Sequence, residues 1–358
     1  MRFKKPEKKH IVTLAVFLAC LVLAGALQLL RVYIVKKQPD LHADARFAPE
    51  SAYTQISCFF AEGEEIPPER TTEFSFKLDS GLVTNAIESV NGDARLFLTC
   101  HAAEGSVDLE RAGKTATAPA IGTGGDYFFF HPVPLVSGMY YNADSLSADQ
   151  VLIDETLAWQ LFGGFNVEGQ TLSVNGRPHV VRGVVKTGKG RLREAAGHAD
   201  MLIYLPVETL LESGTVHGTE NSISSFEAVL PNPVRGFASD LVRTQLGFDE
   251  NQMKIVDQGI RFENVSLFQV LKGFGTRSMT GTLFSYPYWE NIARGTEDIL
   301  SLVMLAQALL LFVPVILFVW FVVQAYRHKT WTAQGLYERI SDTLYERQAR
   351  QRLNRRKA

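Results

Sequence analysis

The chain has 358 residues, of which 46% are hydrophobic and 21% are charged, and its net charge is −2. This length allows one or two domains with hydrophobic cores, and the lack of repeats and low-complexity tracts excludes repeat proteins and disordered chains. The charges are segregated: residues 1–10 carry +4, residues 31–298 carry 22 basic against 34 acidic residues, and residues 325–358 carry +6.

Two long runs without charge predict two membrane-spanning helices. Residues 11–30 contain no charged residue, and neither do residues 299–324. A helix rises about 1.5 Å per residue, so roughly 20 apolar residues cross a hydrocarbon layer about 30 Å thick. We therefore predict transmembrane helices over residues 11–35 and 299–324.

The charges that flank the two runs predict the orientation in the cell (plasma) membrane. Basic flanks stay in the cytoplasm, so we expect a cytoplasmic N-terminus (1–10), an acidic extracytoplasmic domain (36–298) and a basic cytoplasmic tail (325–358). A basic tail could also be a nucleic-acid arm. A tail tethered to a membrane fits lipid headgroups or a protein partner better, and we expect no nucleic acid partner.

The first run could instead be a cleaved signal peptide, because basic residues precede it and Ala24-Gly25-Ala26 offers small side chains. The apolar stretch continues to Leu30, which is too long for the apolar region of a typical signal peptide. We therefore predict that the helix is retained. Cys20 does not fit a lipoprotein site, because the preceding residues differ and more apolar chain follows it.

The external domain opens and closes with a similar order of strand and helix. Residues 52–60 are rich in β-branched and aromatic types and predict a strand, residues 67–87 predict a helix, and residues 95–100 predict a second strand. The same order returns over residues 225–256, where the helical stripe stops at Gly247. Two βαβ-like halves around a central block predict a split α+β unit with an insertion.

The central block, residues 126–220, is predicted to be rich in strands. The aromatic run at residues 127–130 favours a strand. Asp154 is the expected N-cap of a short helix that ends before Gly163. Asn175-Gly176 lies between two apolar stretches and is the strongest short signal for a β-hairpin.

This block also contains six short sequences in a characteristic order: LVSG at 135–138, VLIDETLA at 151–158, LFG at 161–163, VEGQTL at 167–172, NGRPHVVRGVV at 175–185 and MLIYLP at 201–206. Their succession resembles the periplasmic core domain of MacB-like ABC transporter permeases, the superfamily that includes FtsX-like and lipoprotein-release permeases. The resemblance covers most of the chain, from the first span to the second.

The resemblance implies a fold class: an α+β external domain flanked by two transmembrane α-helices. A split porter-like α+β lobe would occupy about 45–125 and 221–290, and an inserted β-rich sabre-like lobe about 126–220. Permeases of this family do not pass substrate through the membrane. They form dimers in which an ATPase moves the external domains, a process called mechanotransmission.

The sequence departs from the family in its number of spans. Family permeases have four membrane helices, three of them after the external domain, whereas this sequence has one there. The resemblance therefore implies a separate ABC ATPase and a separate FtsX-like permease subunit as partners, in a homo- or heterodimer. The alternative is a membrane-anchored extracytoplasmic binding or scaffold module that is not coupled to ATP.

The sequence predicts no enzyme, no catalytic residue, no cofactor and no metal site. Gly183 to Gly190 departs from a phosphate-binding loop, because Gly190 stands where Ser or Thr is required. The eight histidines are dispersed, without metal-ligand spacing. His131, before Pro132, is expected on the surface or in a loop.

Three smaller features allow alternative interpretations. Cys58 and Cys100 lie near the ends of predicted strands and could form a disulfide or remain two buried thiols. Gln28 and Gln307 lie within the spans and could bond the helices to each other or merely be tolerated there. In the tail, an apolar stripe on a potential helix predicts either an interfacial helix on membrane lipids or a coupling segment that docks on the ATPase; its residues are Trp331, Leu336, Ile340 and Leu344.

Overall fold

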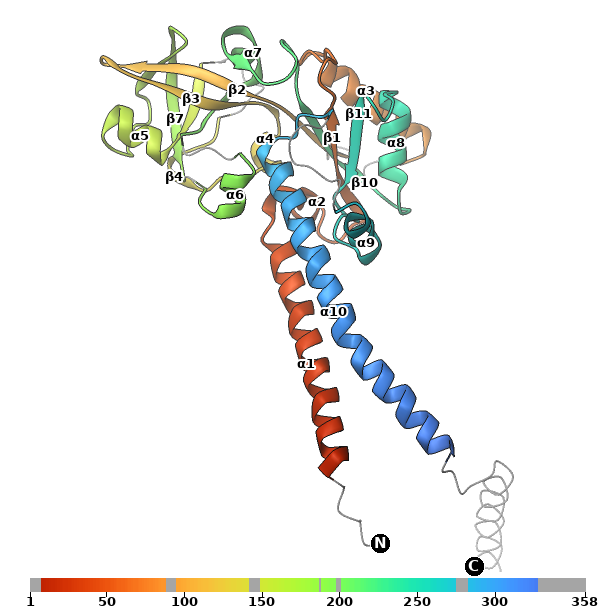
Figure 1. The fold of residues 1–358 in the computed structure, drawn as a ribbon. Helices are drawn as coiled ribbons and strands as arrows, with labels where there is room; N and C mark the ends of the chain where they lie inside the picture. Colours follow the sequence, from red (N-terminus) through yellow and green to blue (C-terminus); the bar gives the residue numbers. More distant parts are fainter. Residues whose placement is uncertain are drawn as a thin grey trace, which may run out of the picture. The chain divides into compact units, whose positions relative to one another are not determined.

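The computed structural model of the chain describes residues 8–87, 95–141, 149–186, 188–197, 201–274 and 283–327. It divides into two compact units: a folded domain, Arg31–Met304, and a helical unit whose described residues are 8–30 and 305–327 (Figure 1). The tail stripe of Trp331, Leu336, Ile340 and Leu344 lies outside the described residues, so it stays a prediction.

Two helices, α1 (Lys8–Lys36) and α10 (Tyr288–Arg327), are long and apolar enough to cross a membrane. In the helical unit, Gln307 Nε2 donates hydrogen bonds to the carbonyl oxygen of Ala24 and to Gln28 Oε1, each at 3.3 Å. Of the two alternatives left open for these glutamines, the structure thus shows the hydrogen bond between the helices. Ala24 is buried, and its small side chain lets the backbones approach closely.

Within the described residues of the folded domain, eleven strands form one mixed sheet. Its main order is β11-β1-β10-β2-β3-β8-β5-β7-β4, while β6 pairs with β2 and β7, and β9 pairs with β2. The strands are β1 (Tyr53–Phe60), β2 (Leu98–Arg111), β3 (Lys114–Gly125), β4 (Leu135–Gly138), β5 (Gln150–Asp154), β6 (Thr171–Val174), β7 (Arg177–Val185), β8 (Ile203–Pro206), β9 (Thr215–Val216), β10 (Ser225–Pro231) and β11 (Met253–Asp257).

The predicted split α+β unit is confirmed. Strand β10 lies between β1 and β2, strand β1 lies between β10 and β11, and all these neighbours are antiparallel. The units β1–α3–β2 and β10–α8–β11 therefore interleave. The helices of the folded domain are η1 (Pro39–Leu41), α2 (Ala43–Phe47), α3 (Arg70–Thr84), α4 (Tyr127–Phe130), α5 (Glu155–Phe162), α6 (Arg191–Ala195), α7 (Val207–Ser213), α8 (Phe237–Leu246) and α9 (Asn264–Lys272).

The two faces of strand β1 meet different surroundings, because successive side chains on a strand point to opposite sides. Ile56 and Cys58 belong to the hydrophobic cluster that also contains residues of α3 and α8. Those two helices lie side by side over this part of the sheet (Figure 1). Gln55 and Ser57 alternate with Ile56 and Cys58, so they point to the opposite face, where they are equally buried.

The strand predicted at residues 127–130 is wrong: these residues form the short helix α4. Tyr127 and Phe130 are both buried, and their spacing of three residues places both on one side of a helical turn. The backbone N–H groups of Phe129 and Phe130 donate to the carbonyl oxygen of Asp126. Tertiary burial thus overrides the β propensity of the aromatic run.

The local signals of the central block are confirmed. Asp154 accepts a hydrogen bond from the backbone N–H of Leu157 at 2.8 Å, and Gly163 ends α5 in the left-handed conformation, with φ of 75°. Asn175 and Gly176 join β6 to β7 with φ values of 47° and 80°, as a type I′ turn requires.

Replacing Gly176 with valine should lower the free energy of unfolding of the folded domain by roughly 1 kcal/mol or more, because a β-branched residue is strained at positive φ. An added Cβ would meet no atom within 4 Å, so the cost would come from backbone strain alone. Gly164→Val is the matched control, since that half-buried glycine also has free space and is not at positive φ. Equal denaturation midpoints for the two variants would contradict the turn assignment.

Cys58 and Cys100 are both buried, and both are free thiols. They belong to hydrophobic clusters on opposite faces of the sheet, with β10 between their strands. This arrangement does not bring their side chains together.

Candidate functional site at the junction of the sheet and the membrane helices

The candidate site is built around Glu227 on β10, which is 1% exposed. Its Oε2 accepts hydrogen bonds from Gln55 Nε2 and Ser57 Oγ, each at 2.7 Å. Its Oε1 accepts one from Trp289 Nε1 at 3.0 Å and lies 2.9 Å from His131 Nε2. Four donors satisfy this carboxylate, which is the condition for burying a charge.

His131 lies between two carboxylates, because its Nδ1 is 3.3 Å from Asp40 Oδ1. It is fully buried directly after α4, so the expectation of a surface or loop histidine is wrong. Burial alone lowers its pKa, but the charge of Glu227 and the hydrogen bonds to Asp40 and Glu227 outweigh burial and raise the pKa of His131 to about 9. We therefore interpret the ring as an imidazolium that donates from both nitrogens.

The charge of His131 also acts on Glu227. Burial raises the pKa of a carboxyl group, but the imidazolium and the hydrogen bonds from His131, Ser57 and Gln55 outweigh this effect, and the pKa of Glu227 is lowered. The two side chains form a buried ion pair whose members each stabilise the charged form of the other.

Asp40 lies in η1, only four residues after the end of α1. Gln55 fixes this segment on the sheet, since its Nε2 donates to the carbonyl oxygen of Asp40 at 2.9 Å and its Oε1 accepts from the backbone N–H of Ala43 at 2.9 Å. The chain that leaves α1 is thus bonded to β1 through both ends of one buried amide.

A second group of charges is centred on Arg261, which is 4% exposed. Its Nη1 and Nη2 donate to the two carboxylate oxygens of Glu290 at 2.6 and 2.7 Å, and its Nε donates to Glu297 at 2.6 Å. Burial lowers the pKa of a guanidinium, but the two carboxylates outweigh it and raise the pKa of Arg261. Both glutamates lie in the part of α10 that precedes its uncharged run.

Gln258 joins the two groups of charges. Its Nε2 donates to Ser57 Oγ at 2.9 Å, and its Oε1 accepts from Arg261 Nη1 at 3.1 Å. We call the connected set the junction network; its members are Asp40, Gln55, Ser57, His131, Glu227, Gln258, Arg261, Trp289, Glu290 and Glu297. It runs from the exit of α1, through β1 and β10, to the start of α10.

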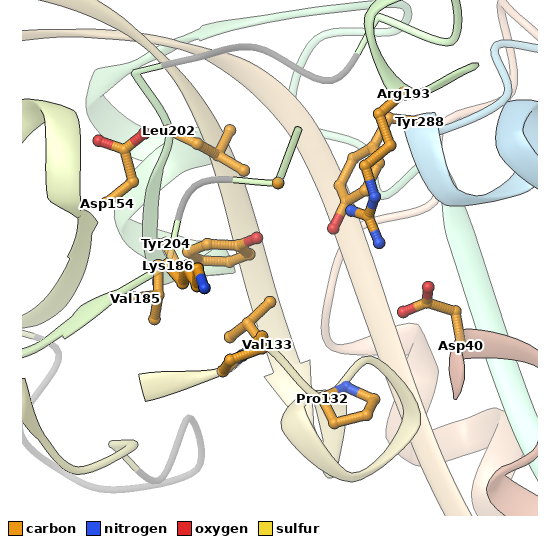
Figure 2. A pocket seen from close by; sticks show the side chains of 12 residues that line it. Asp40, Pro132, Val133, Asp154, Val185, Lys186, Arg193, Leu202, Tyr204 and Tyr288 are labelled. Atoms are coloured by element: carbon orange, nitrogen blue, oxygen red, sulfur yellow. The ribbon is translucent and has the colours of Figure 1, made fainter. Parts of the chain in front are cut away.

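A cavity of about 180 Å³ adjoins the network. Asp40 and Tyr288 line it, together with Lys186 and Arg193, and Figure 2 shows Asp40 and Asp154 on opposite sides of it. Two cationic and two carboxylate side chains balance in charge, so the lining selects neither an anion nor a cation. One of the lining residues, Asp40, bonds to His131 and so connects the cavity wall to the network.

Cys100, His131 and Glu227 lie close enough for one metal ion, with their ligand atoms within 4.8 Å of one another. A metal would need a neutral imidazole and a thiolate. Both His131 nitrogens already face carboxylates, and burial raises the pKa of the Cys100 thiol. These residues therefore do not fit a metal, and we interpret them as part of the ion pair and its apolar wall.

Glu104 on β2 gives the folded domain a stability change near neutral pH. Its Oε1 accepts from the backbone N–H of Tyr288 at 3.1 Å, and burial raises its pKa from 4.5 to about 7. The folded state thus binds more protons than the unfolded state between pH 4.5 and 7, and this group's contribution to stability falls as pH rises through that window.

Relative to the wild type, the free energy of unfolding of Glu104→Gln should therefore rise by on the order of 1 to 2 kcal/mol between pH 4 and pH 8. Urea denaturation of the full chain in detergent micelles at the two pH values measures this. Glu220→Gln, at an exposed glutamate, is the matched control and should show no such difference. A pH-independent effect of Glu104→Gln would rule out the raised pKa.

The sequence did not predict the network, because a polar residue that alternates with apolar ones on a strand usually faces solvent. Gln55 and Ser57 follow that pattern, yet the segment after α1 and the start of α10 cover their face. The signal that could have found them is the presence of Glu227 in an otherwise apolar strand. By contrast, neither Cys58 nor Cys100 is among the hydrogen-bonded members of the network, and the site predicted in the chain's tail lies outside the described residues.

The sheet and the interleaved βαβ units form an α+β domain that is flanked in the sequence by two helices long and apolar enough to cross a membrane. A sequence profile of the MacB-like periplasmic core domain matches residues 15–235, more than half of the chain. The chain belongs to this family, the periplasmic domains of ABC transporter permease-type proteins. Two apolar helices that flank such a domain fit a two-pass membrane protein. The family is not a known class of enzymes.

Similar solved structures include the periplasmic region of MacB from Actinobacillus actinomycetemcomitans, with 17% identity over 63% of this chain and 94% of that chain and a TM-score of 0.39. The extracellular domain of the noncanonic ABC-type transporter YknZ from Gram-positive bacteria shows 16% identity over 56% of this chain and 99% of that chain, with a TM-score of 0.35. A domain of a putative permease from Porphyromonas gingivalis shows 15% identity over 57% and 90%, with a TM-score of 0.34. A comparison with curated proteins gives no match.

Proposed function

We propose that the chain is a membrane subunit of an ABC-type assembly and works by mechanotransmission. The observation that supports this best is the junction network, which bonds the exits of both membrane helices to the same two strands. Because the network is buried and its charges are paired, separating one helix end from the sheet would leave an unpaired buried charge. Movements of the helices and the sheet are therefore coupled.

The proposed orientation places both termini in the cytoplasm and the folded domain outside. The charges of +4, −12 and +6 along the chain support it. Protease added to cells without wall or outer membrane should cut within residues 36–298 and spare a reporter fused after Ala358. A reporter that is active only outside the cytoplasm would overturn this orientation.

The proposed partners are a separate ABC ATPase and an FtsX-like permease subunit, in a homo- or heterodimer. Affinity purification of the full chain from its native membrane, followed by identification of co-purifying proteins, tests this. Ile340→Asp in the tail should abolish recovery of the ATPase, whereas the matched variant Ile340→Leu should retain it. Full recovery with a chain truncated after Lys329 would refute docking through the tail, and finding no ATPase at all would favour the scaffold alternative.

The coupling itself is tested with Gln258→Leu, which removes the side-chain bridge from Ser57 to Arg261 and leaves the Arg261–Glu290, His131–Glu227 and Trp289–Glu227 contacts in place. We expect this variant to co-purify with the ATPase as the wild type does, but to lose the transport activity of the assembly. Gln269→Leu, at an exposed glutamine nearby, is the control and should retain it. Full activity of Gln258→Leu would show that the network is an anchor and not a transmission path.

A further inference from the structure

Helix α9 (Asn264–Lys272) exposes apolar side chains on its outer face. Val265 is 66% exposed and Phe268 is 52% exposed, and Phe274, directly after the helix, is 43% exposed. On the inner face, Leu267 is fully buried. Lys272 also lies on the outer side, with its Nζ 4.8 Å from the centre of the Phe268 ring.

Two contacts connect α9 and the segment before it to residues that adjoin the uncharged runs in the sequence. Arg31 is the first charged residue after the run at residues 11–30, and its Nη2 donates to Oδ1 of Asn264, the first residue of α9, at 2.7 Å. Arg261, three residues before α9, binds Glu297, which lies two residues before the run at residues 299–324. The start of α9 is therefore held next to the residues that follow the first uncharged run and precede the second.

We propose that α9 lies in the headgroup layer of the membrane leaflet on the side of the folded domain. Val265 and Phe268 would insert into the boundary with the acyl chains, and Lys272 would extend to lipid phosphates. Short amphipathic helices with aromatic and apolar residues on one side and lysine at the rim bind membrane surfaces in this way. Aromatic side chains and snorkelling lysines favour this depth of the bilayer.

A protein partner fits the same face less well. Lysine is depleted at protein interfaces, where its ammonium would lose water, and here the Lys272 ammonium stands over the exposed Phe268 ring. At a lipid surface the same ammonium stays hydrated beside phosphate. The proposal needs no ATPase, so it can fail or hold independently of the proposed function.

The test uses the full chain with Cys20→Ala, reconstituted in vesicles of phosphatidylcholine and phosphatidylglycerol. Single nitroxide labels are placed at Val265→Cys or Phe268→Cys, and at Phe76→Cys as the matched control, since Phe76 is 71% exposed on α3 at the outer surface of the sheet. The native Cys58 and Cys100 are buried and resist labelling, because burial raises their thiol pKa.

We expect labels at 265 and 268 to collide with oxygen and to lose accessibility to a water-soluble nickel chelate, whereas the label at 76 stays accessible to nickel. Nickel accessibility at 268 equal to that at 76 would overturn the proposal, because α9 would then face water. Shielding of 265 and 268 from both reagents would also overturn it, because a protein surface would then cover the helix. Matching denaturation midpoints of labelled and unlabelled protein verify that the variants fold.

Discussion

His131→Leu should lower the free energy of unfolding of the folded domain by about 3–5 kcal/mol at pH 7, because it leaves the buried Glu227 carboxylate without its cation. Glu227 is 1% exposed, and His131 Nε2 lies 2.9 Å from its Oε1. The remaining donors from Gln55, Ser57 and Trp289 still bind the carboxylate but carry no charge to offset its burial. Urea denaturation of the full chain in detergent micelles measures the loss.

A double variant, His131→Leu combined with Glu227→Gln, separates the loss of the ion pair from the loss of packing. The amide keeps an acceptor for the three neutral donors and removes the unpaired charge, so the double variant should recover a large part of the loss. If the single and double variants were equally unstable, the loss would come from packing of the ring against Trp289 and not from the ion pair.

The same pair predicts a pH dependence. The pKa of His131 is raised from 6.5 to about 9, so its stabilising contribution is fully present below pH 6.5 and is lost as pH rises through 9. The pKa of Glu227 is lowered, so its contribution is present above its ordinary value and is lost as pH falls through the lowered one. In His131→Leu, the decline in stability between pH 6.5 and 9 that belongs to this histidine should disappear.

Arg261→Met should lower the free energy of unfolding by a similar amount, roughly 3–5 kcal/mol, because it removes the guanidinium that is hydrogen-bonded to the buried carboxylates of Glu290 and Glu297. Both carboxylates are less than 10% exposed, and three short hydrogen bonds are lost. The control is Arg235→Met, which removes an exposed ion pair with Glu263 and should cost less than about 1 kcal/mol. Denaturation in detergent micelles measures both variants.

Adding Glu290→Met and Glu297→Leu to Arg261→Met would remove the unpaired charges. The triple variant should regain stability, because apolar residues of similar volume often replace buried ion pairs without loss. It should also lack transport activity if the network transmits movement. A triple variant as unstable as Arg261→Met would show that the cost lies in packing rather than in uncompensated charge.

Local signals predicted much of the fold. The uncharged runs, the cap at Asp154 and the turn at Asn175-Gly176 depend on residues that are adjacent in the sequence, and all three appear in the structure. The helix at residues 127–130 could not be predicted in this way, because burial of Tyr127 and Phe130 against distant residues decides its conformation.

The junction network could not be predicted from the sequence. Its charged members come from five separate segments: Asp40 after α1, His131 after α4, Glu227 on β10, Arg261 before α9, and the start of α10. Apart from Glu227, which interrupts an apolar strand, each of them alone looks like a solvated surface charge. Only the topology that places β1 beside β10, and covers both with Trp289, shows that the charges are paired and buried.

The hairpin of β2 and β3 has a mechanical consequence. Strand β2 pairs with β10 near its start and with β6 near its end, so one strand of 14 residues extends from the junction network into the central block. At about 3.4 Å per residue, such a strand is about 45 Å long, and a tilt of about 5° at its base would sweep its far end through about 4 Å. In the proposed mechanotransmission, the hairpin would thus act as a lever arm, whose tip travels much farther than the helix ends.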